Sequence, residues 1–150
     1  ERVGVTGIFL GSYFFWDARK QLEIIKEYGF KIKEDGPIEG TYTNYENLDE
    51  RLVGLHDYLK YVKYGFGRAS HDCSQEIRNN HLTREDGKRL VKKFDGEFPN
   101  IYFDEIMDFI DMKKDEFFKL CNKFRSPHIW KKKGRNYTLR HTVNEDGADD

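Results

Sequence analysis

The chain has 150 residues, of which 37% are hydrophobic and 35% charged, and its formal net charge is −1. This length fits one domain, and the many Phe and Tyr residues supply apolar area that a disordered chain lacks. The near-zero charge gives no overall attraction to nucleic acid or to an anionic membrane, so we expect neither as a partner. Cys73 and Cys121 form no zinc or disulfide pattern, and no apolar run approaches the ~20 residues of a membrane span, so we expect a cytoplasmic protein.

The first third of the chain predicts mixed elements. β-Branched and aromatic residues broken by glycines indicate a short, bent strand within 3–16. Asp17 is a suitable N-cap for a helix over 18–27, which Gly29 would end. Residues 30–33 suggest a short strand, and the Gly, Pro and Asn content of 34–49 indicates a loop.

Helices dominate the rest. An apolar stripe at helical spacing runs from Leu48 to Val62 and is interrupted by Gly65 and Gly67. Thr83 and Asp86 resemble a capping box for a helix through Phe94, and apolar residues mark two further helices, around Phe103–Ile110 and Phe117–Phe124. Alternation predicts a late strand within 137–143, and 144–150 is an acidic tail expected to be disordered. The fold class is therefore mainly α with short β segments.

Residues 67–79 separate into two faces when placed on a helix. Ala69, Cys73 and Ile77 share one face, so Cys73 is interpreted as a small core residue. The opposite face is polar, and there Arg68 and Asp72 are spaced as an i,i+4 ion pair.

Two interpretations of this polar face remain open. It is either a solvated surface or a site where Lys63, Arg68 and Arg78 converge on phosphate oxygens, with the backbone of Gly65 and Gly67 allowing close approach. The uneven distribution of charge favours binding of an anionic ligand. Residues 60–93 contain nine Lys or Arg and four Asp or Glu, and residues 123–141 contain seven Lys or Arg and no Asp or Glu. No ligand pair has zinc spacing, so we expect no metal site.

Several sequence blocks resemble the C-terminal portion of the N-acetyl sugar amidotransferase family, and the likeness covers 1–143 almost throughout. The blocks that carry it are Lys63-x-Gly65-x-Gly67-Arg68, Glu76-Ile77-Arg78, Thr83-Arg84-Glu85, Phe94-Asp95-Gly96-Glu97-Phe98-Pro99 and Arg125-Ser126-Pro127-His128, together with GIFLGSYFFWD near the start. The resemblance implies that 1–143 is the helical C-terminal region of a PP-loop α/β enzyme of lipopolysaccharide O-antigen biosynthesis.

The resemblance also implies a reaction, in which ATP activates an acetamido carbonyl of a nucleotide-linked sugar and ammonia from a glutamine-hydrolysing partner subunit then gives an acetamidino group. Lys63 and Arg68 would stabilise the departing pyrophosphate. The further roles that it implies are orientation of these cations for Asp72 and Glu76, and contacts with the sugar nucleotide for Arg78, Arg84, Arg125 and His128.

One departure from the family is important: the Ser-Gly-Gly-x-Asp-Ser phosphate loop is absent from the 150 residues. We therefore expect that ATP and Mg²⁺ are bound mainly by a missing N-terminal half, that the chain starting at Glu1 is part of a longer protein, and that it is inactive alone. Two alternatives are a helical module that docks a glutaminase, and an RNA-binding region of a tRNA-modifying relative. Self-association into a homo-oligomer is compatible with each.

Overall fold

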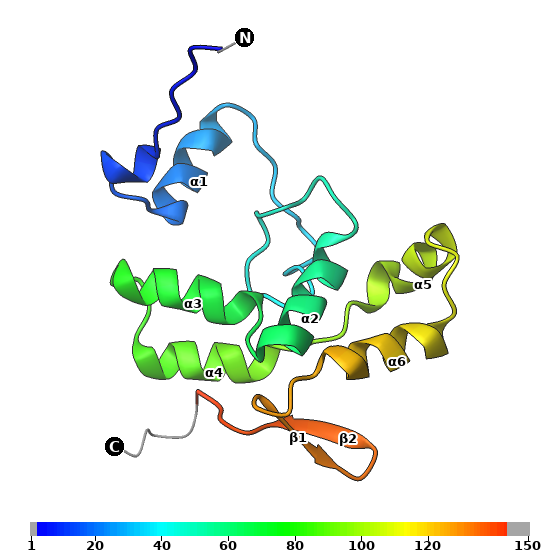
Figure 1. The fold of residues 1–150 in the computed structure, drawn as a ribbon. Coiled ribbons are helices and arrows are strands. Elements are labelled where there is room, and N and C mark those ends of the chain that lie inside the picture. The colour runs from blue at the N-terminus through cyan, green and yellow to red at the C-terminus, as the bar shows by residue number, and fades with distance from the viewer. Residues whose placement is uncertain (1–2, 144–150) are drawn as a thin grey trace. The chain divides into compact units, whose positions relative to one another are not determined.

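The computed structural model describes residues 3–143, and Figure 1 shows their elements. The chain divides into two compact units, residues 1–31 and 32–150. In the described part, helices predominate and the only sheet has two short strands, which confirms the predicted fold class. The acidic segment 144–150, expected to form a disordered tail, lies outside the described residues. Of the described helices, the longest has 12 residues, and none is long and apolar enough to cross a bilayer.

The first unit contains the 3-10 helix η1 (Leu10–Ser12) and helix α1 (Ala18–Glu27). The Asp17 carboxylate accepts hydrogen bonds from the backbone N–H groups of Arg19 (3.1 Å) and Lys20 (3.3 Å), so the predicted cap is confirmed. The strand predicted within 3–16 is wrong. A strand needs a partner for its backbone groups, and no described strand pairs with this segment.

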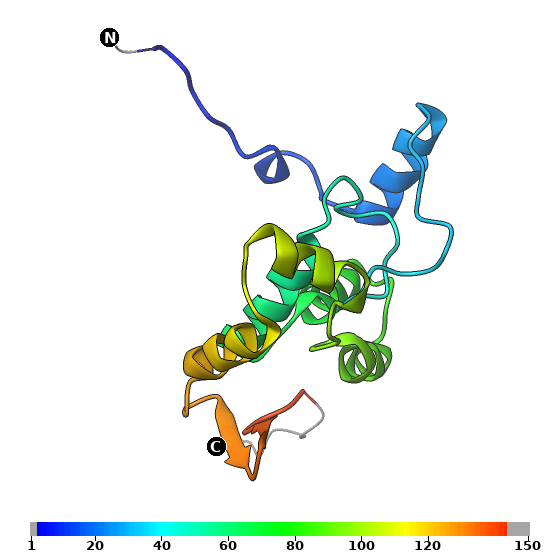
Figure 2. The ribbon, with the colours of Figure 1, turned by 90° about the vertical axis from the view of Figure 1, so that its right-hand side faces the viewer.

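The second unit contains five helices followed by a β-hairpin (Figures 1 and 2). Their bounds are α2 (Val53–Tyr64), α3 (Arg68–Arg78), α4 (Arg84–Phe94), α5 (Asn100–Phe109), α6 (Lys114–Phe124), β1 (Trp130–Lys133) and β2 (Asn136–Leu139). The strands are antiparallel, with Trp130 opposite Leu139. The late strand was thus predicted in part, whereas β1 was not predicted. The strand predicted over 30–33 is wrong, since Lys33 only donates one backbone hydrogen bond to Asn44, at 2.8 Å.

The core lies where α2, α5 and α6 meet. It is built from the apolar stripes of these helices: Leu55, Val62, Phe103, Ile106, Met107, Phe117 and Cys121. Trp130 ties the hairpin to this core, because its indole N–H donates to the Val62 carbonyl oxygen at 2.8 Å. The Arg125 guanidinium lies 4.3 Å from the centre of the Trp130 ring, a cation–π contact that holds the turn before β1.

Helices α3 and α4 form an antiparallel pair whose ends are joined by a carboxylate. Asp95, just after α4, accepts hydrogen bonds from Gly67 N–H (2.8 Å), Ser70 N–H (3.1 Å) and the Ser70 hydroxyl (2.6 Å). These bonds satisfy amides at the start of α3 that have no partner within the helix. Asp95, in the segment Phe94-Asp95-Gly96, therefore determines where α3 begins.

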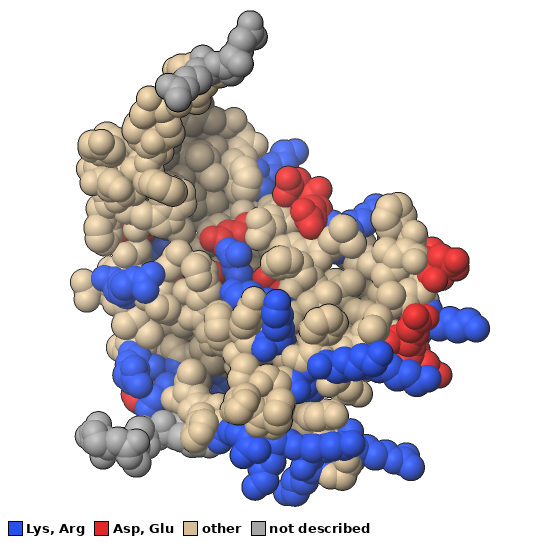
Figure 3. Space-filling model, in the orientation of Figure 1, with Lys and Arg blue, Asp and Glu red and all other residues tan. Residues whose placement is uncertain are grey.

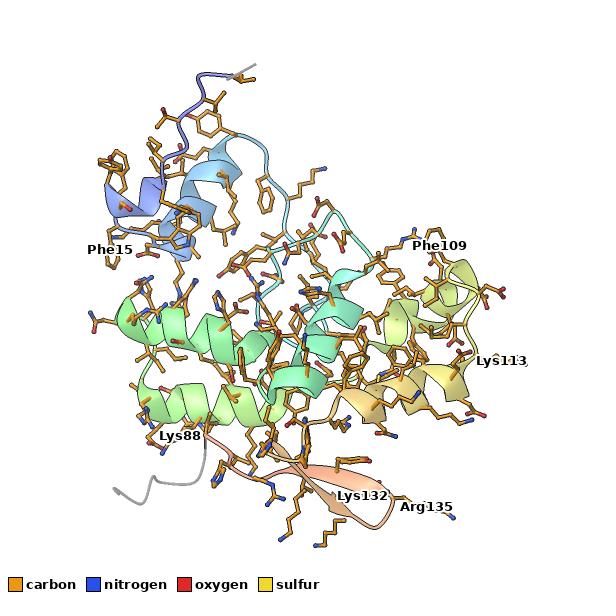
Figure 4. All side chains as sticks on the ribbon, viewed as in Figure 1. Phe15, Lys88, Phe109, Lys113, Lys132 and Arg135 are labelled. Atoms are coloured by element: carbon orange, nitrogen blue, oxygen red, sulfur yellow. The ribbon has the colours of Figure 1, made fainter. Side chains whose placement is uncertain are left out.

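Positive side chains gather over the hairpin (Figure 3). Lys132 and Arg135 point away from the helices, whereas Lys88 on α4 lies near the point where the described chain ends (Figure 4). All residues of the hairpin except Trp130, Tyr137 and Leu139 are exposed.

Candidate functional site

The polar face of α3 is covered by a loop. Asp72 and Glu76 are only 6% and 7% exposed, so the interpretation of this face as solvated is wrong for both residues. The Thr41 hydroxyl, from the loop before α2, donates to Asp72 Oδ2 at 2.6 Å. Glu76 lies one turn further along α3, beside Tyr42 of the same loop. A buried carboxylate requires partners, and one partner of Asp72 is thus a hydroxyl group from a segment far away in sequence.

Arg68 is held by two carboxylates. Its Nε donates to Asp72 Oδ1 at 2.9 Å, which confirms the predicted i,i+4 pair, and its Nη2 contacts Glu46. Within residues 3–143, Nη1 makes no hydrogen bond, so one arm of the guanidinium stays available to a ligand. The Asp72 carboxylate therefore holds the Nε end of the Arg68 side chain in place.

Lys63 is placed differently. It is exposed near the end of α2, and its ammonium lies 5.1 Å from the centre of the Tyr64 ring. Across the described residues it forms no ion pair. An ammonium without a carboxylate keeps its full charge for an incoming anion.

Lys63 and Arg68 line adjoining cavities rather than one. Arg68 lines a cavity of about 370 Å³, here called the α2 cavity, together with His56, Asp57, Lys60 and His71. Lys63 lines a hollow of about 430 Å³ beside it. His56 and Lys60 line both, so Lys60 lies between the two predicted cations. Sequence reasoning missed Lys60, although its spacing of three residues from Lys63 places both on one side of α2.

Two titratable groups of the α2 cavity are shifted toward their neutral forms. Burial raises the pKa of the Asp57 carboxyl, and His56 and Lys60 only partly oppose this effect. Burial and the nearby Arg68 cation lower the pKa of His71. A neutral imidazole beside an arginine can accept a proton near pH 7. His71, which the sequence interpretation left without a role, therefore belongs to this site.

Gly65 and Gly67 are required by packing. Gly65 ends α2 with φ of +80°, and a Cβ there would lie 2.6 Å from Ile129 Cγ2. A Cβ on Gly67 would lie 2.7 Å from Asp95 Oδ1, and the Gly67 N–H already donates to Asp95. Side chains rather than these backbone amides are therefore the groups that remain for an anion.

A second basic site lies between α3 and α4. Arg78 and Arg84, predicted as ligand contacts, both line a pocket of about 520 Å³, and Lys88 joins them there. We call it the α3–α4 pocket. The other two predicted contacts are elsewhere, because Arg125 packs on Trp130 and His128 is exposed in the turn before β1. The sequence feature that could have indicated this pocket is Gly87, a glycine within a helix. In the structure a Cβ at this position would lie 2.9 Å from Ile77 Cδ1.

Cys73 forms part of the floor of this pocket and is a core residue, as predicted. It is 3% exposed, and burial raises the pKa of its thiol to about 11. Its Sγ donates weakly to the Gly87 carbonyl oxygen at 3.7 Å. A thiol with this pKa is protonated at neutral pH and is a poor nucleophile.

Comparison with protein-family models identifies a family for most of the chain. A model of the family described as "LPS biosynthesis protein WbpG-like, C-terminal domain" matches residues 39–143. These residues include α2 to α6, the hairpin, both basic sites and every predicted site residue. No curated protein matches the chain.

Proposed function

The chain belongs to the family of WbpG-like C-terminal domains of lipopolysaccharide biosynthesis proteins, and from this we propose that it forms part of an ATP-dependent N-acetyl sugar amidotransferase. The observation that carries the proposal is that the family match includes the basic sites. The substrate would be a nucleotide-linked acetamido sugar of O-antigen biosynthesis, and the product its acetamidino derivative. The reaction would take place in the cytoplasm.

The reaction has two steps. The acetamido carbonyl oxygen attacks the α-phosphorus of ATP, and pyrophosphate leaves. Ammonia then attacks the activated carbon and loses a proton, and AMP departs with the former carbonyl oxygen to leave an amidine. ATP supplies the AMP group that makes this oxygen a leaving group, because an unactivated amide oxygen leaves poorly.

Cations of this chain suit the first step. Negative charge develops on the departing pyrophosphate, and a fixed lysine or arginine lowers the barrier by stabilising that charge. Lys63 offers an unpaired ammonium within the described chain, and Arg68 offers Nη1 while Asp72 and Glu46 hold the rest of its guanidinium. Lys60 lies between them and would stabilise the same negative charge.

The proton released in the second step needs an acceptor. His71 suits this role because it lines the same cavity as Arg68, and because its lowered pKa keeps the imidazole neutral and thus able to accept a proton. The phosphate loop that holds ATP and Mg²⁺ would come from outside these 150 residues, since they contain no Ser-Gly-Gly-x-Asp-Ser motif.

Ammonia would come from a glutamine-hydrolysing partner subunit. Exposed apolar side chains on α5 suit such a partner: Ile101 is 60% and Phe109 83% exposed. Side chains of this kind are what a protein interface covers.

The test uses the protein that joins this region to a phosphate loop, and measures ATP–pyrophosphate exchange in the presence of the sugar. Lys63→Ala and Arg68→Ala should each lower the exchange rate by about 10²-fold, as loss of one charge-stabilising donor does. Arg68→Lys guards against a folding defect, because it keeps the charge and should retain part of the rate. Lys119→Ala, an exposed charge on α6, is the matched control. Rates for both alanine variants within twofold of this control would reject the assignment.

A further inference from the structure

The α3–α4 pocket combines three positive charges with apolar surface. Three cations line it and no carboxylate does: Arg78, Arg84 and Lys88. By contrast, a cavity of about 550 Å³ beside α5 is lined by four carboxylates and only two cations: Asp35, Glu39, Asp49 and Glu50, with Lys33 and Arg51. Anions are repelled by the second cavity and attracted by the first.

We propose that the α3–α4 pocket binds a diphosphate ester, in which two linked phosphate groups are attached to an organic group. The identity of the natural ligand rests on the proposed function, which requires a nucleotide-linked sugar. The site itself rests on geometry and can be tested without any catalysis.

The two arginines have donors that are free to bind a ligand. Arg84 makes no side-chain hydrogen bond or ion pair within residues 3–143, although it lines the pocket from the first turn of α4. Arg78, at the end of α3, donates only to the Ser74 hydroxyl at 2.9 Å. Two guanidinium groups from different helices can each present a pair of N–H donors to phosphate oxygens.

Lys88 contributes a third positive charge to the lining of the pocket. Its side chain is 15% exposed, and its ammonium lies 3.2 Å from the Glu85 carboxylate. Hydroxyl groups of Ser70, Ser74 and Thr142 also line the pocket and can donate to the same oxygens. A diphosphate, with several oxygens and two or three charges, uses such a set better than a single carboxylate.

The apolar part of the pocket lining is the reason to infer an ester rather than free pyrophosphate. Ile77, Val91 and Val143 line the pocket together with Cys73, whose thiol is neutral. Gly87 lets α4 approach α3 closely, because a Cβ there would lie 2.9 Å from Ile77 Cδ1. A volume of about 520 Å³ lies within the range of small-ligand sites and exceeds what two phosphates fill.

The experiment is isothermal titration calorimetry on this chain with inorganic phosphate, pyrophosphate, uridine diphosphate and geranyl diphosphate. Saturable binding of at least one ester is expected, at least tenfold tighter than that of pyrophosphate. Preference for uridine diphosphate identifies a nucleoside group, and preference for geranyl diphosphate identifies a lipid group.

Matched variants test the site. Arg78→Ala with Arg84→Ala should weaken ester binding by about tenfold or more for each arginine. Arg78→Lys with Arg84→Lys should lose less, because the charges stay while paired donation is lost. Lys119→Ala with Lys123→Ala removes two charges from α6 and should change the affinity less than twofold.

Three results would overturn the proposal. They are the absence of saturable ester binding, an unchanged affinity in the double alanine variant, and pyrophosphate binding as tight as that of both esters. None of them bears on Lys63 or Arg68, so failure here is distinguishable from failure of the proposed reaction.

Discussion

Replacing Asp95 by alanine removes the three hydrogen bonds that join the end of α4 to the start of α3. Loss of a capping carboxylate costs about 0.5–2 kcal/mol. The buried Gly67 N–H would also lose its acceptor, at about 1–3 kcal/mol. We expect the free energy of unfolding to fall by about 2–4 kcal/mol. Asp95→Asn keeps an acceptor oxygen, so its loss should be about 1 kcal/mol.

Urea unfolding followed by far-UV circular dichroism measures this effect, with the midpoint and slope fitted separately. Asp104→Ala is the control, because this carboxylate is exposed and pairs only with the exposed Lys114 at 2.6 Å. An exposed ion pair contributes about 0–1 kcal/mol. If Asp95→Ala were no more destabilising than Asp104→Ala, the capping role would be refuted.

Two further predictions concern packing and pH. Gly96→Ala should lower the free energy of unfolding by more than about 2 kcal/mol, because φ is +80° and a Cβ would lie 2.3 Å from Tyr61 Cε1. Gly134→Ala is the comparison: φ is +63° and the space around it is open, so it should cost about 1 kcal/mol. Thermal unfolding of both variants measures the difference. The free energy of unfolding should fall as pH rises from about 9 to 11, because the Cys73 thiol has a pKa of about 11 when folded and 9.0 when unfolded, so that the unfolded chain releases its proton first. Cys73→Ala should flatten this pH dependence, and an unchanged slope would contradict it.

Local signals in the sequence predicted much of the fold. Helix α1 begins and ends as expected, since its limits depend on Asp17 and Gly29 alone. Gly65 ends α2 as expected, but α2 starts at Val53, and Leu48 and Leu52 of the apolar stripe lie in the loop before it. Periodicity describes one face of a helix and does not locate its first turn unless a capping residue is present.

The missed features depend on contacts between distant segments. Asp72 and Glu76 are buried because the loop containing Thr41 and Tyr42 covers them, and a loop without periodicity gives no sign of where it packs. Strand β1 was missed because three consecutive lysines are typical of a solvated charge run.

The sequence identified individual candidate residues but did not show how they group in space. Arg78 and Arg84 were predicted to contact the sugar nucleotide, and one interpretation also placed Arg78 with Lys63 and Arg68. The structure places Arg78 and Arg84 in a pocket distinct from that of Arg68, which their positions in the sequence do not show. Lys60 was missed because a lysine on an amphipathic helix looks the same whether it faces solvent or a cavity.

The most direct test of the proposed reaction follows one oxygen atom. The nucleotide-linked sugar is labelled with ¹⁸O in its acetamido carbonyl and turned over by the protein that joins this region to a phosphate loop, with ATP, glutamine and the glutaminase subunit. Mass spectrometry of the AMP product should show the ¹⁸O label, because activation transfers the AMP group to that oxygen and amidine formation releases both together. Amidine formed alongside unlabelled AMP would contradict the account.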